Sequence, residues 1–229
     1  MRILIFSDLH ANLEGLLALQ QAEKKPDALL FLGDAVGYGP DPTACVEWLR
    51  QNVTFAVQGD HDRAAGSGAE CESPVDWRAL AEATCAVART TLPSADRDYL
   101  AALPPTRTVE LGGVRFCLNH RVADEASALT ASEQIWQPWL DSSRADILLF
   151  GHTHVPLLRR VGKSWVVNPG SLGQPRHGLP SITYAVWNDG DLRIQHIDYD
   201  PRRTIQKLGL LPLDPDDLLR LRQALERGI

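Results

Sequence analysis

Acidic and imidazole side chains recur at one kind of place in this sequence, directly after short runs of apolar residues. Each run has the length of a buried strand. Carboxylates and neutral imidazoles are ligands for Mn²⁺, Fe, Zn²⁺, Co²⁺ or Ni²⁺. The groups in such positions are Asp8, His10, Asp34, Asp60, His120, His152 and His154. Their types and their placement predict a metal site.

The number of these groups indicates two metal ions. The set is too large for one ion but suits two ions that share a carboxylate. Two ions about 3.5–4 Å apart can clamp a phosphoryl group and generate a hydroxide nucleophile near neutral pH. The set contains no thiolate, which argues against a structural zinc site. The chain has 7 histidines; four belong to this set and a fifth, His61, directly follows Asp60, so we interpret the set as one functional site.

The preceding strands must share one edge of a sheet for these groups to meet. The apolar runs Arg2–Phe6, 28–32 and 53–57 alternate with helical patterns over 13–23 and 43–51. This β-α-β-α-β order predicts parallel strands with helical crossovers. Ligands of open α/β sheets bind at the carboxyl ends of the strands, where the predicted metal ligands lie.

The rest of the chain predicts further strands, three more helices and a helical tail. Strands are expected at 106–111, 114–118, 146–150, 156–160, 164–167, 182–187 and 192–197. Helices are expected at 74–91, 94–103 and 132–140, and in the tail over about 201–229. Gly112-Gly113 between the first two of these strands predicts a tight hairpin. We expect two sheets with helices outside, in a single domain over residues 1–229.

Composition limits the partners. The net charge is −6 and Lys and Arg form no run, so duplex nucleic acid is an unlikely partner. No stretch approaches the roughly 20 apolar residues that span a bilayer, and the first apolar run is too short for a signal peptide. Cys45, Cys71, Cys85 and Cys117 form no C-x-x-C pair and are interpreted as reduced thiols of a cytoplasmic protein. The oligomeric state is left open.

The motifs as a set resemble the calcineurin-like metallophosphoesterases. That family has D-x-H, G-D, G-N-H-D or G-N-H-E, a single His, and G-H-x-H. The corresponding residues are Asp8-Leu9-His10, Gly33-Asp34, Gly59-Asp60-His61-Asp62, His120 and Gly151-His152-Thr153-His154. Segments 7–12, 37–40 and 168–171 resemble its small bacterial branch, which includes phosphodiesterases and relatives labelled as diadenosine tetraphosphatases.

The resemblance implies a fold and a role for each residue. The fold would be α/β (α+β), a four-layer αββα sandwich of two mixed sheets flanked by helices. One metal would be held by Asp8, His10, Asp34 and His154, and the other by Asp34, Asp60, His120 and His152. His61 would stabilise the phosphate or protonate the leaving oxygen. Asp62 would orient His61 or cap the next helix. Beside these roles, our own candidates for substrate contacts are Asn12, Arg63 and Arg121.

Two departures from the family pattern affect the expected activity. Asp60 replaces the usual Asn, which adds a negative charge at the second metal; our hypothesis is that it keeps two-metal binding, changes metal preference and lowers turnover. Arg121 replaces the usual Gly after the single His and would grip phosphate or lie on the surface. Arg63 and Arg176 are the other candidate cations. The segment after Asp34 lacks the D-R-G of protein phosphatases, which disfavours phosphoprotein substrates.

We therefore expect an enzyme with two divalent ions, with Mn²⁺ favoured over Fe, Zn²⁺, Ni²⁺ and Co²⁺. It would hydrolyse phosphodiester or phosphoanhydride bonds of small nucleotide-like substrates with a metal-activated hydroxide. One alternative is a catalytically weakened interaction scaffold, with an exposed apolar surface around Trp136 and Trp139 as its signature. The other is a nuclease, which the acidic charge disfavours.

Overall fold

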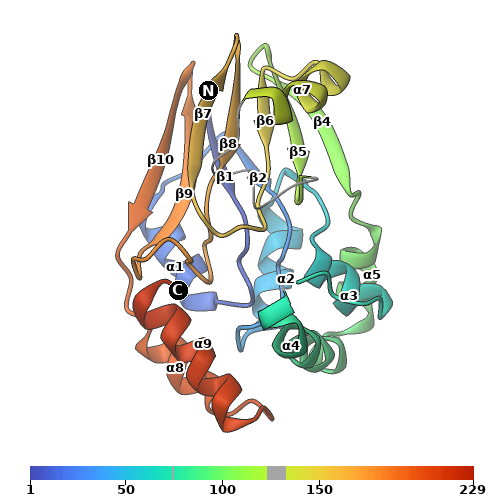
Figure 1. Ribbon diagram of the computed structural model, residues 1–229, viewed down its shortest axis with the longest axis vertical. Coiled ribbons are helices and arrows are strands. Elements are labelled where there is room, and N and C mark those ends of the chain that lie inside the picture. The colour runs from blue at the N-terminus through green and yellow to red at the C-terminus, as the bar shows by residue number, and fades with distance from the viewer. Residues whose placement is uncertain (74, 123–132) are drawn as a thin grey trace.

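Two five-stranded mixed sheets form the centre of the molecule (Figure 1). The structure is a computed structural model, and it describes residues 1–73, 75–122 and 133–229. The strand order is β10-β9-β1-β2-β3 in the first sheet and β4-β5-β6-β8-β7 in the second. The bounds are β1 (Arg2–Phe6), β2 (Ala28–Phe31), β3 (Phe55–Ala56), β4 (Thr106–Leu111), β5 (Val114–Asn119), β6 (Ile147–Leu149), β7 (Leu157–Val161), β8 (Ser164–Asn168), β9 (Ile182–Asn188) and β10 (Asp191–Ile197).

The strands that precede the candidate metal ligands are parallel within each sheet. β1 pairs with β2, and β2 pairs with β3, in parallel register. In the second sheet β6 lies parallel between β5 and β8. The predicted β-α-β-α-β order is confirmed, and so is the β4–β5 hairpin, in which Gly112 and Gly113 both have positive φ.

Helices cover the outer faces of both sheets. Their bounds are α1 (Leu13–Ala22), α2 (Pro42–Asn52), α3 (Asp60–Ser67), α4 (Arg78–Thr91), α5 (Ser94–Ala102), α7 (Gln137–Ser143), α8 (Arg202–Leu208) and α9 (Pro215–Arg227). The expected helix over 74–91 begins later, after a 3₁₀ turn at Val75–Trp77, and residue 74 lies outside the described residues. The expected helix over 132–140 is a 3₁₀ turn at Glu133–Ile135 followed by α7; Ser132 is not among the described residues. Sequence reasoning did not predict α3.

None of the helices in the described ranges is both long enough and apolar enough to cross a membrane.

Alternating side chains along the strands produce four layers. Ile3 and Ile5 of β1 point to the second sheet and pack with Leu149 of β6 in one buried cluster. Phe6 points the other way, toward the helices α1, α2 and α5. Leu148 of β6 lies in a third cluster, beneath α7. A strand that is buried on both faces explains the continuous apolar runs. The predicted αββα sandwich is confirmed.

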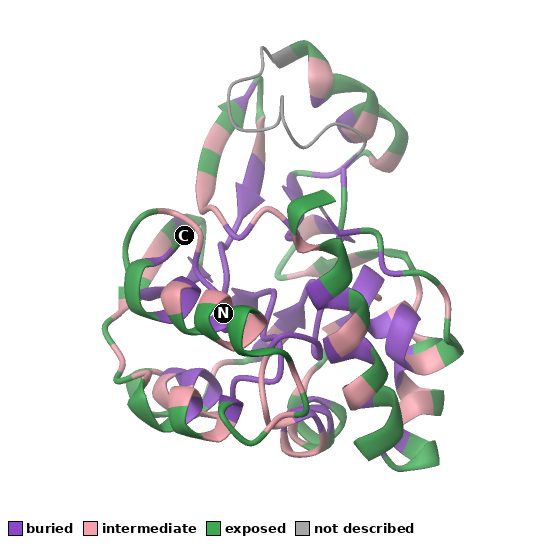
Figure 2. Ribbon diagram, turned by 60° about the horizontal axis from the view of Figure 1, so that its bottom comes forward, coloured by how far each residue is buried: buried purple, intermediate pink, exposed green. Residues whose placement is uncertain are grey.

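The C-terminal helices lie beside each other at the end of the molecule that carries α4 (Figure 1). Leu208 of α8 and Leu221 and Leu225 of α9 pack with Leu80 of α4 in a fourth apolar cluster. The outward faces of these helices are exposed and their inward faces are buried (Figure 2). The two C-terminal helices therefore pack against α4 as part of the same domain surface.

Leu30 tests the contact between the sheets. Leu30 is fully buried in the cluster between them, so Leu30→Ala leaves a cavity and should lower the free energy of unfolding by about 2–5 kcal/mol. Leu158→Ala on β7 is the control, because Leu158 is 37% exposed. Urea denaturation measures both variants. Equal losses in the two would contradict the assignment of Leu30 to the central core.

Candidate metal centre

Five strand ends bring the sequence-predicted ligands together. Asp8 and His10 follow β1, Asp34 follows β2, Asp60 follows β3, His120 follows β5, and His152 and His154 follow β6. Their donor atoms form two compact groups, in each of which all atoms lie within 4.8 Å of one another. One group is Asp8, His10 and His154, and the other is Asp34, Asp60, His120 and His152. All seven residues are buried.

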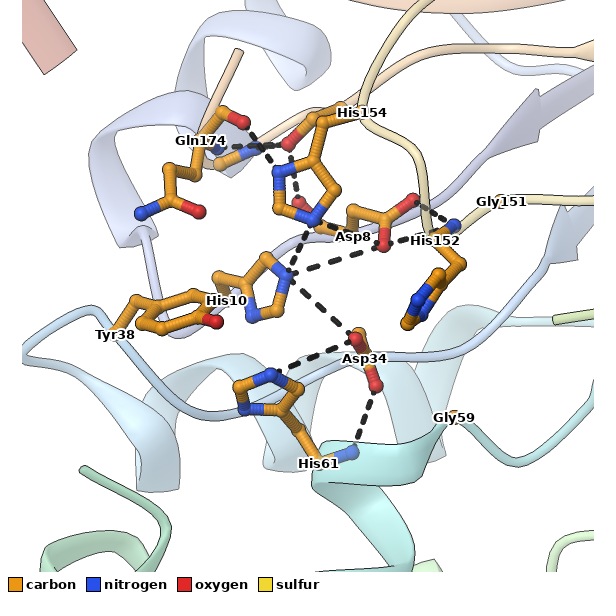
Figure 3. A network of polar contacts seen from close by, with 12 residues as sticks. Asp8, His10, Asp34, Tyr38, Gly59, His61, Gly151, His152, His154 and Gln174 are labelled. Carbon is orange, nitrogen blue, oxygen red and sulfur yellow. Dashed lines mark hydrogen bonds and ion pairs between the residues drawn. The ribbon is translucent and has the colours of Figure 1, made fainter. Parts of the chain in front are cut away.

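Two imidazoles of the first group face each other through the same nitrogen. The Nε2 atoms of His10 and His154 are 3.0 Å apart (Figure 3). Each Nδ1 contacts a backbone carbonyl, Val36 O at 3.0 Å and Gln174 O at 2.6 Å. A carbonyl only accepts, so each Nδ1 carries the ring proton and each Nε2 of a neutral imidazole presents a lone pair.

Both rings of this pair are held in the neutral form. Burial, with repulsion from His61 and His154, holds the pKa of His10 well below its usual range. Burial and the positive charge of Arg176 lower the pKa of His154. Two lone pairs at this distance repel unless a cation lies against both. The Asp8 carboxylate, with Oδ1 3.4 Å from His154 Nε2, completes a ligand set that fits a divalent metal.

The second group concentrates carboxylate oxygens around His120. Nδ1 of His120 donates to Leu32 O at 2.7 Å. Nε2 of the same ring is directed at Asp60 Oδ1 (3.1 Å) and Asp34 Oδ2 (3.3 Å). Burial opposes protonation of His120, but the two carboxylates outweigh it and raise its pKa well above the ordinary value. Nδ1 of His152 lies 3.0 Å from the same Asp60 oxygen. A proton or a metal ion must therefore offset the negative charge at this point.

Asp34 lies between the two groups. Its Oδ2 is 3.6 Å from His10 Nε2 and 3.3 Å from His120 Nε2. Its Oδ1 accepts the backbone N–H of His61 at 3.0 Å. The carboxylate faces His10 and His61 in Figure 3. One oxygen directed at both groups is the placement that a shared ligand requires.

The backbone bends sharply to aim these side chains. Asp8, His10, Asp34, His152 and His154 all have φ between 45° and 65°, a left-handed conformation that costs a non-glycine residue about 1–3 kcal/mol. Asn168 at the end of β8 supports the last of these bends, because its Nδ2 donates to Gly151 O and to Thr153 Oγ1.

Motif glycines allow the loops to approach one another. A Cβ on Gly59 would lie 2.1 Å from Asp34 Oδ1, and one on Gly37 would lie 2.1 Å from His61 Nδ1. Neither position has room for a side chain, which explains why glycine precedes the Asp60-His61 pair.

His61 lies beside both groups, in the first turn of α3. Its Nε2 is 4.0 Å from Oδ2 of both Asp34 and Asp60, and 3.3 Å from Ser73 Oγ. Its Nδ1 is 3.2 Å from Cys85 Sγ. Burial disfavours the charged ring, but Cys85 and Asp34 outweigh it and raise the pKa of His61 well above the ordinary value.

Asp62 is bonded to backbone rather than to the His61 ring. Its carboxylate accepts the N–H groups of Gly59 (3.0 Å), Asp34 (2.9 Å) and Ala35 (2.8 Å). Of the two roles considered from the sequence, these contacts correspond to the helix cap, at the start of α3. They also tie the loop of Asp34 to that helix.

Asn12 is bonded on both ends of its amide, and it caps α1. Its Oδ1 accepts from Gly15 N and Thr204 Oγ1, and its Nδ2 donates to Gly173 O and Tyr199 Oη. It is 1% exposed. These contacts give Asn12 a structural role, and its expected contact with substrate stays a prediction.

Arg63 and Arg121 lie together beside the second group. A cavity of about 370 Å³ is lined by both, together with Asp60 and His120. Glu72 lies between the two arginines, 2.6 Å from Arg63 Nη2 and 2.8 Å from Arg121 Nη1. Arg63 and Arg121 thus line the same cavity as the candidate ligands, and Glu72 partly neutralises their charge.

Arg176, a candidate cation from the sequence, lies next to the centre, where sequence reasoning missed Ser73, Cys71 and Cys85. Arg176 lies over the rings of Trp77 and Tyr38, with its Cζ 4.4 Å from the first centroid and 5.7 Å from the second. Its Nε is buried and has no hydrogen-bond partner among the described residues. Ser73, Cys71 and Cys85 surround His61. They come from loops and from α4, so no spacing in the sequence indicated them.

Comparison with known proteins identifies the family. A model of the calcineurin-like phosphoesterase superfamily domain matches residues 1–189. The chain therefore belongs to this family and is a metal-dependent phosphoesterase, as the motif resemblance implied.

Relatives match nearly the whole chain. Phosphodiesterase YfcE of Escherichia coli is 25% identical, over 82% of this chain and 89% of that protein. The uncharacterized protein MJ0912 of Methanocaldococcus jannaschii is 27% identical, over 90% of this chain and 91% of its own. The crystal structure of a metallophosphoesterase from Sphaerobacter thermophilus aligns with a TM-score of 0.80 and 26% identity, covering 97% of this chain and 98% of that one.

Asp62→Asn tests the support of the loop that carries Asp34. Asn has one acceptor oxygen in place of two, so at least one of the three buried N–H groups loses its partner. We expect the metal-free variant to lose about 1–3 kcal/mol of unfolding free energy, measured by urea denaturation. Asp98→Asn on α5 is the control, because Asp98 is exposed. A loss no larger than that of the control would contradict this role.

Proposed function

We propose that the protein is a dinuclear phosphoesterase that hydrolyses phosphodiester or phosphoanhydride bonds of small nucleotide-like substrates. The observation that carries the proposal is the contact between two neutral imidazoles, His10 and His154, through unprotonated nitrogens 3.0 Å apart. That contact needs a cation. The second group, with Asp34 turned toward both, supports a second ion.

In this proposal Asp8, His10, Asp34 and His154 hold one ion, and Asp34, Asp60, His120 and His152 hold the other. All donors are carboxylate oxygens or imidazole nitrogens, for which Mn²⁺ is our first choice, ahead of Fe, Zn²⁺, Ni²⁺ and Co²⁺. When bound, such a pair of ions lowers the pKa of water and neutralises charge on a phosphoryl group.

His61 is proposed to act on the phosphate. Its Nε2 faces the space next to Asp34 and Asp60. A protonated ring in this position can donate a hydrogen bond to a phosphate oxygen and can then transfer its proton to the leaving oxygen. Asp62 supports this geometry indirectly, because it caps the helix on which His61 lies.

The substrate is proposed to enter through the cavity beside the second group. Its volume of about 370 Å³ suits a small ligand rather than a duplex or a folded protein. Arg63 and Arg121 line it and would bind phosphate oxygens in competition with Glu72. Arg176, with an unused Nε and two aromatic neighbours, is a further candidate on the side of His10.

The site favours an enzyme over the scaffold alternative. Trp136, one of the two tryptophans that would mark a scaffold surface, is fully buried at the start of α7 and packs against Phe150. We also place the enzyme in the cytoplasm, which the four free and buried cysteines support.

The first test is metal-dependent hydrolysis. Metal-stripped protein is reloaded with Mn²⁺ and assayed with bis-p-nitrophenyl phosphate beside p-nitrophenyl phosphate. We expect cleavage of the diester, a loss of about 10²–10⁴-fold in His61→Ala, and normal rates in His196→Ala, whose side chain is exposed. No turnover with any divalent metal, although two ions bind, would favour the scaffold.

Asp60→Asn tests the extra charge. Asn keeps an oxygen for the contact with His152 but removes a negative charge, so we expect two ions to bind, turnover to rise up to about tenfold and the order of metal preference to change. Asp34→Asn is the matched control and should lower both metal content and rate. Turnover and metal preference identical to those of the unmodified enzyme would refute the hypothesis for Asp60.

A further inference from the structure

Two thiols and an imidazole form a compact group behind the proposed centre. Cys71 lies in the loop after α3, Cys85 lies on α4, and His61 lies in the first turn of α3. Their donor atoms all lie within 4.8 Å of one another. The contact between Cys85 Sγ and His61 Nδ1 is 3.2 Å long. The three side chains are buried, and the thiols are free.

This donor set differs from that of the proposed dinuclear centre. The centre offers oxygens and imidazoles, which are hard to borderline ligands, whereas two thiolates select softer ions such as Zn²⁺. Zinc sites with two Cys and one His leave a fourth position for a further ligand. The Ser73 hydroxyl also lies next to this group, with Oγ 3.4 Å from Cys71 Sγ and 3.3 Å from His61 Nε2.

A separate cavity leads to the thiols. It has a volume of about 300 Å³, and Cys71 and Cys85 line it together with Glu70 and Glu82. The two carboxylates outnumber the one cationic residue in the lining, Arg89, and so favour the entry of a cation. The cavity beside Asp60 and His120 is lined by other residues, so the thiols have their own route from solvent.

We propose that Cys71, Cys85 and His61 form a third metal site, which binds a thiophilic divalent ion such as Zn²⁺ with the release of the two thiol protons. The ion takes the Nδ1 atom of His61. The remaining ring proton is then on Nε2, which faces Asp34 and Asp60. The site therefore sets the orientation and the tautomer of His61. Binding at this site does not depend on the proposed reaction.

Cobalt substitution tests the proposal, because a Co²⁺–thiolate bond gives an intense near-ultraviolet charge-transfer absorption that oxygen and nitrogen ligands do not give. Metal-stripped, reduced full-length protein is titrated with Co²⁺ under anaerobic conditions. We expect three bound equivalents and the thiolate absorption. Cys71→Ser and Cys85→Ser should each lose the absorption and one equivalent, while Cys45→Ala, which removes a buried thiol on α2, should keep both.

Two controls make the negative result decisive. Thiol titration of the denatured sample must give all 4 cysteines, so that a disulfide cannot account for a missing absorption. Thermal denaturation of each variant verifies folding. No thiolate absorption in fully reduced protein would overturn the proposal, as would an absorption that persists in both serine variants. A failed dinuclear centre would leave the absorption intact and reduce only the other equivalents.

Discussion

The charge of the Asp34 carboxylate, buried between two groups of imidazoles, is the constraint on which the site depends. Oδ2 faces His10 on one side and His120 on the other, while Oδ1 is held by the backbone of His61. Burial of a carboxylate is unfavourable unless donors or cations surround it. The start of α3 supplies the backbone N–H of His61, and the end of β5 supplies His120, whose pKa is raised.

This arrangement requires a rigid frame, because the loops that form it are conformationally unfavourable. Left-handed backbone at residues such as Asp8 and His152 persists only where the surroundings determine it. The frame is the contact between the two sheets, whose clusters on both faces fix the positions of the strand ends. Glycines at the bends then allow a close approach that any side chain would prevent. The stability of the sandwich and the geometry of the site are therefore coupled.

The strand ends and the seven candidate ligands could be predicted from the sequence, since a buried strand leaves a continuous apolar run and the polar residue after it must lie at the sheet edge. Contacts made by loops could not. The contacts of the Asn12 amide with Gly173 and Thr204 join segments far apart in the sequence, so no spacing indicated them. The helix α3 was missed because Asp60 to Ser67 contains few apolar residues to mark a period. The neutralisation of Arg63 and Arg121 by Glu72 depends on tertiary structure alone.

The first turn of α3 joins two kinds of chemistry. Asp60 points to the hard-ligand group, Asp62 caps the helix, and His61 between them has one nitrogen on each side: Nε2 toward Asp34 and Nδ1 toward Cys85. Because imidazole has only two nitrogens, what binds at Nδ1 determines whether Nε2 carries a proton. The partner of His61 on the thiol side therefore decides whether the ring can donate on the phosphate side. A ligand bound by the two thiols can therefore control the protonation of His61 Nε2 without touching substrate.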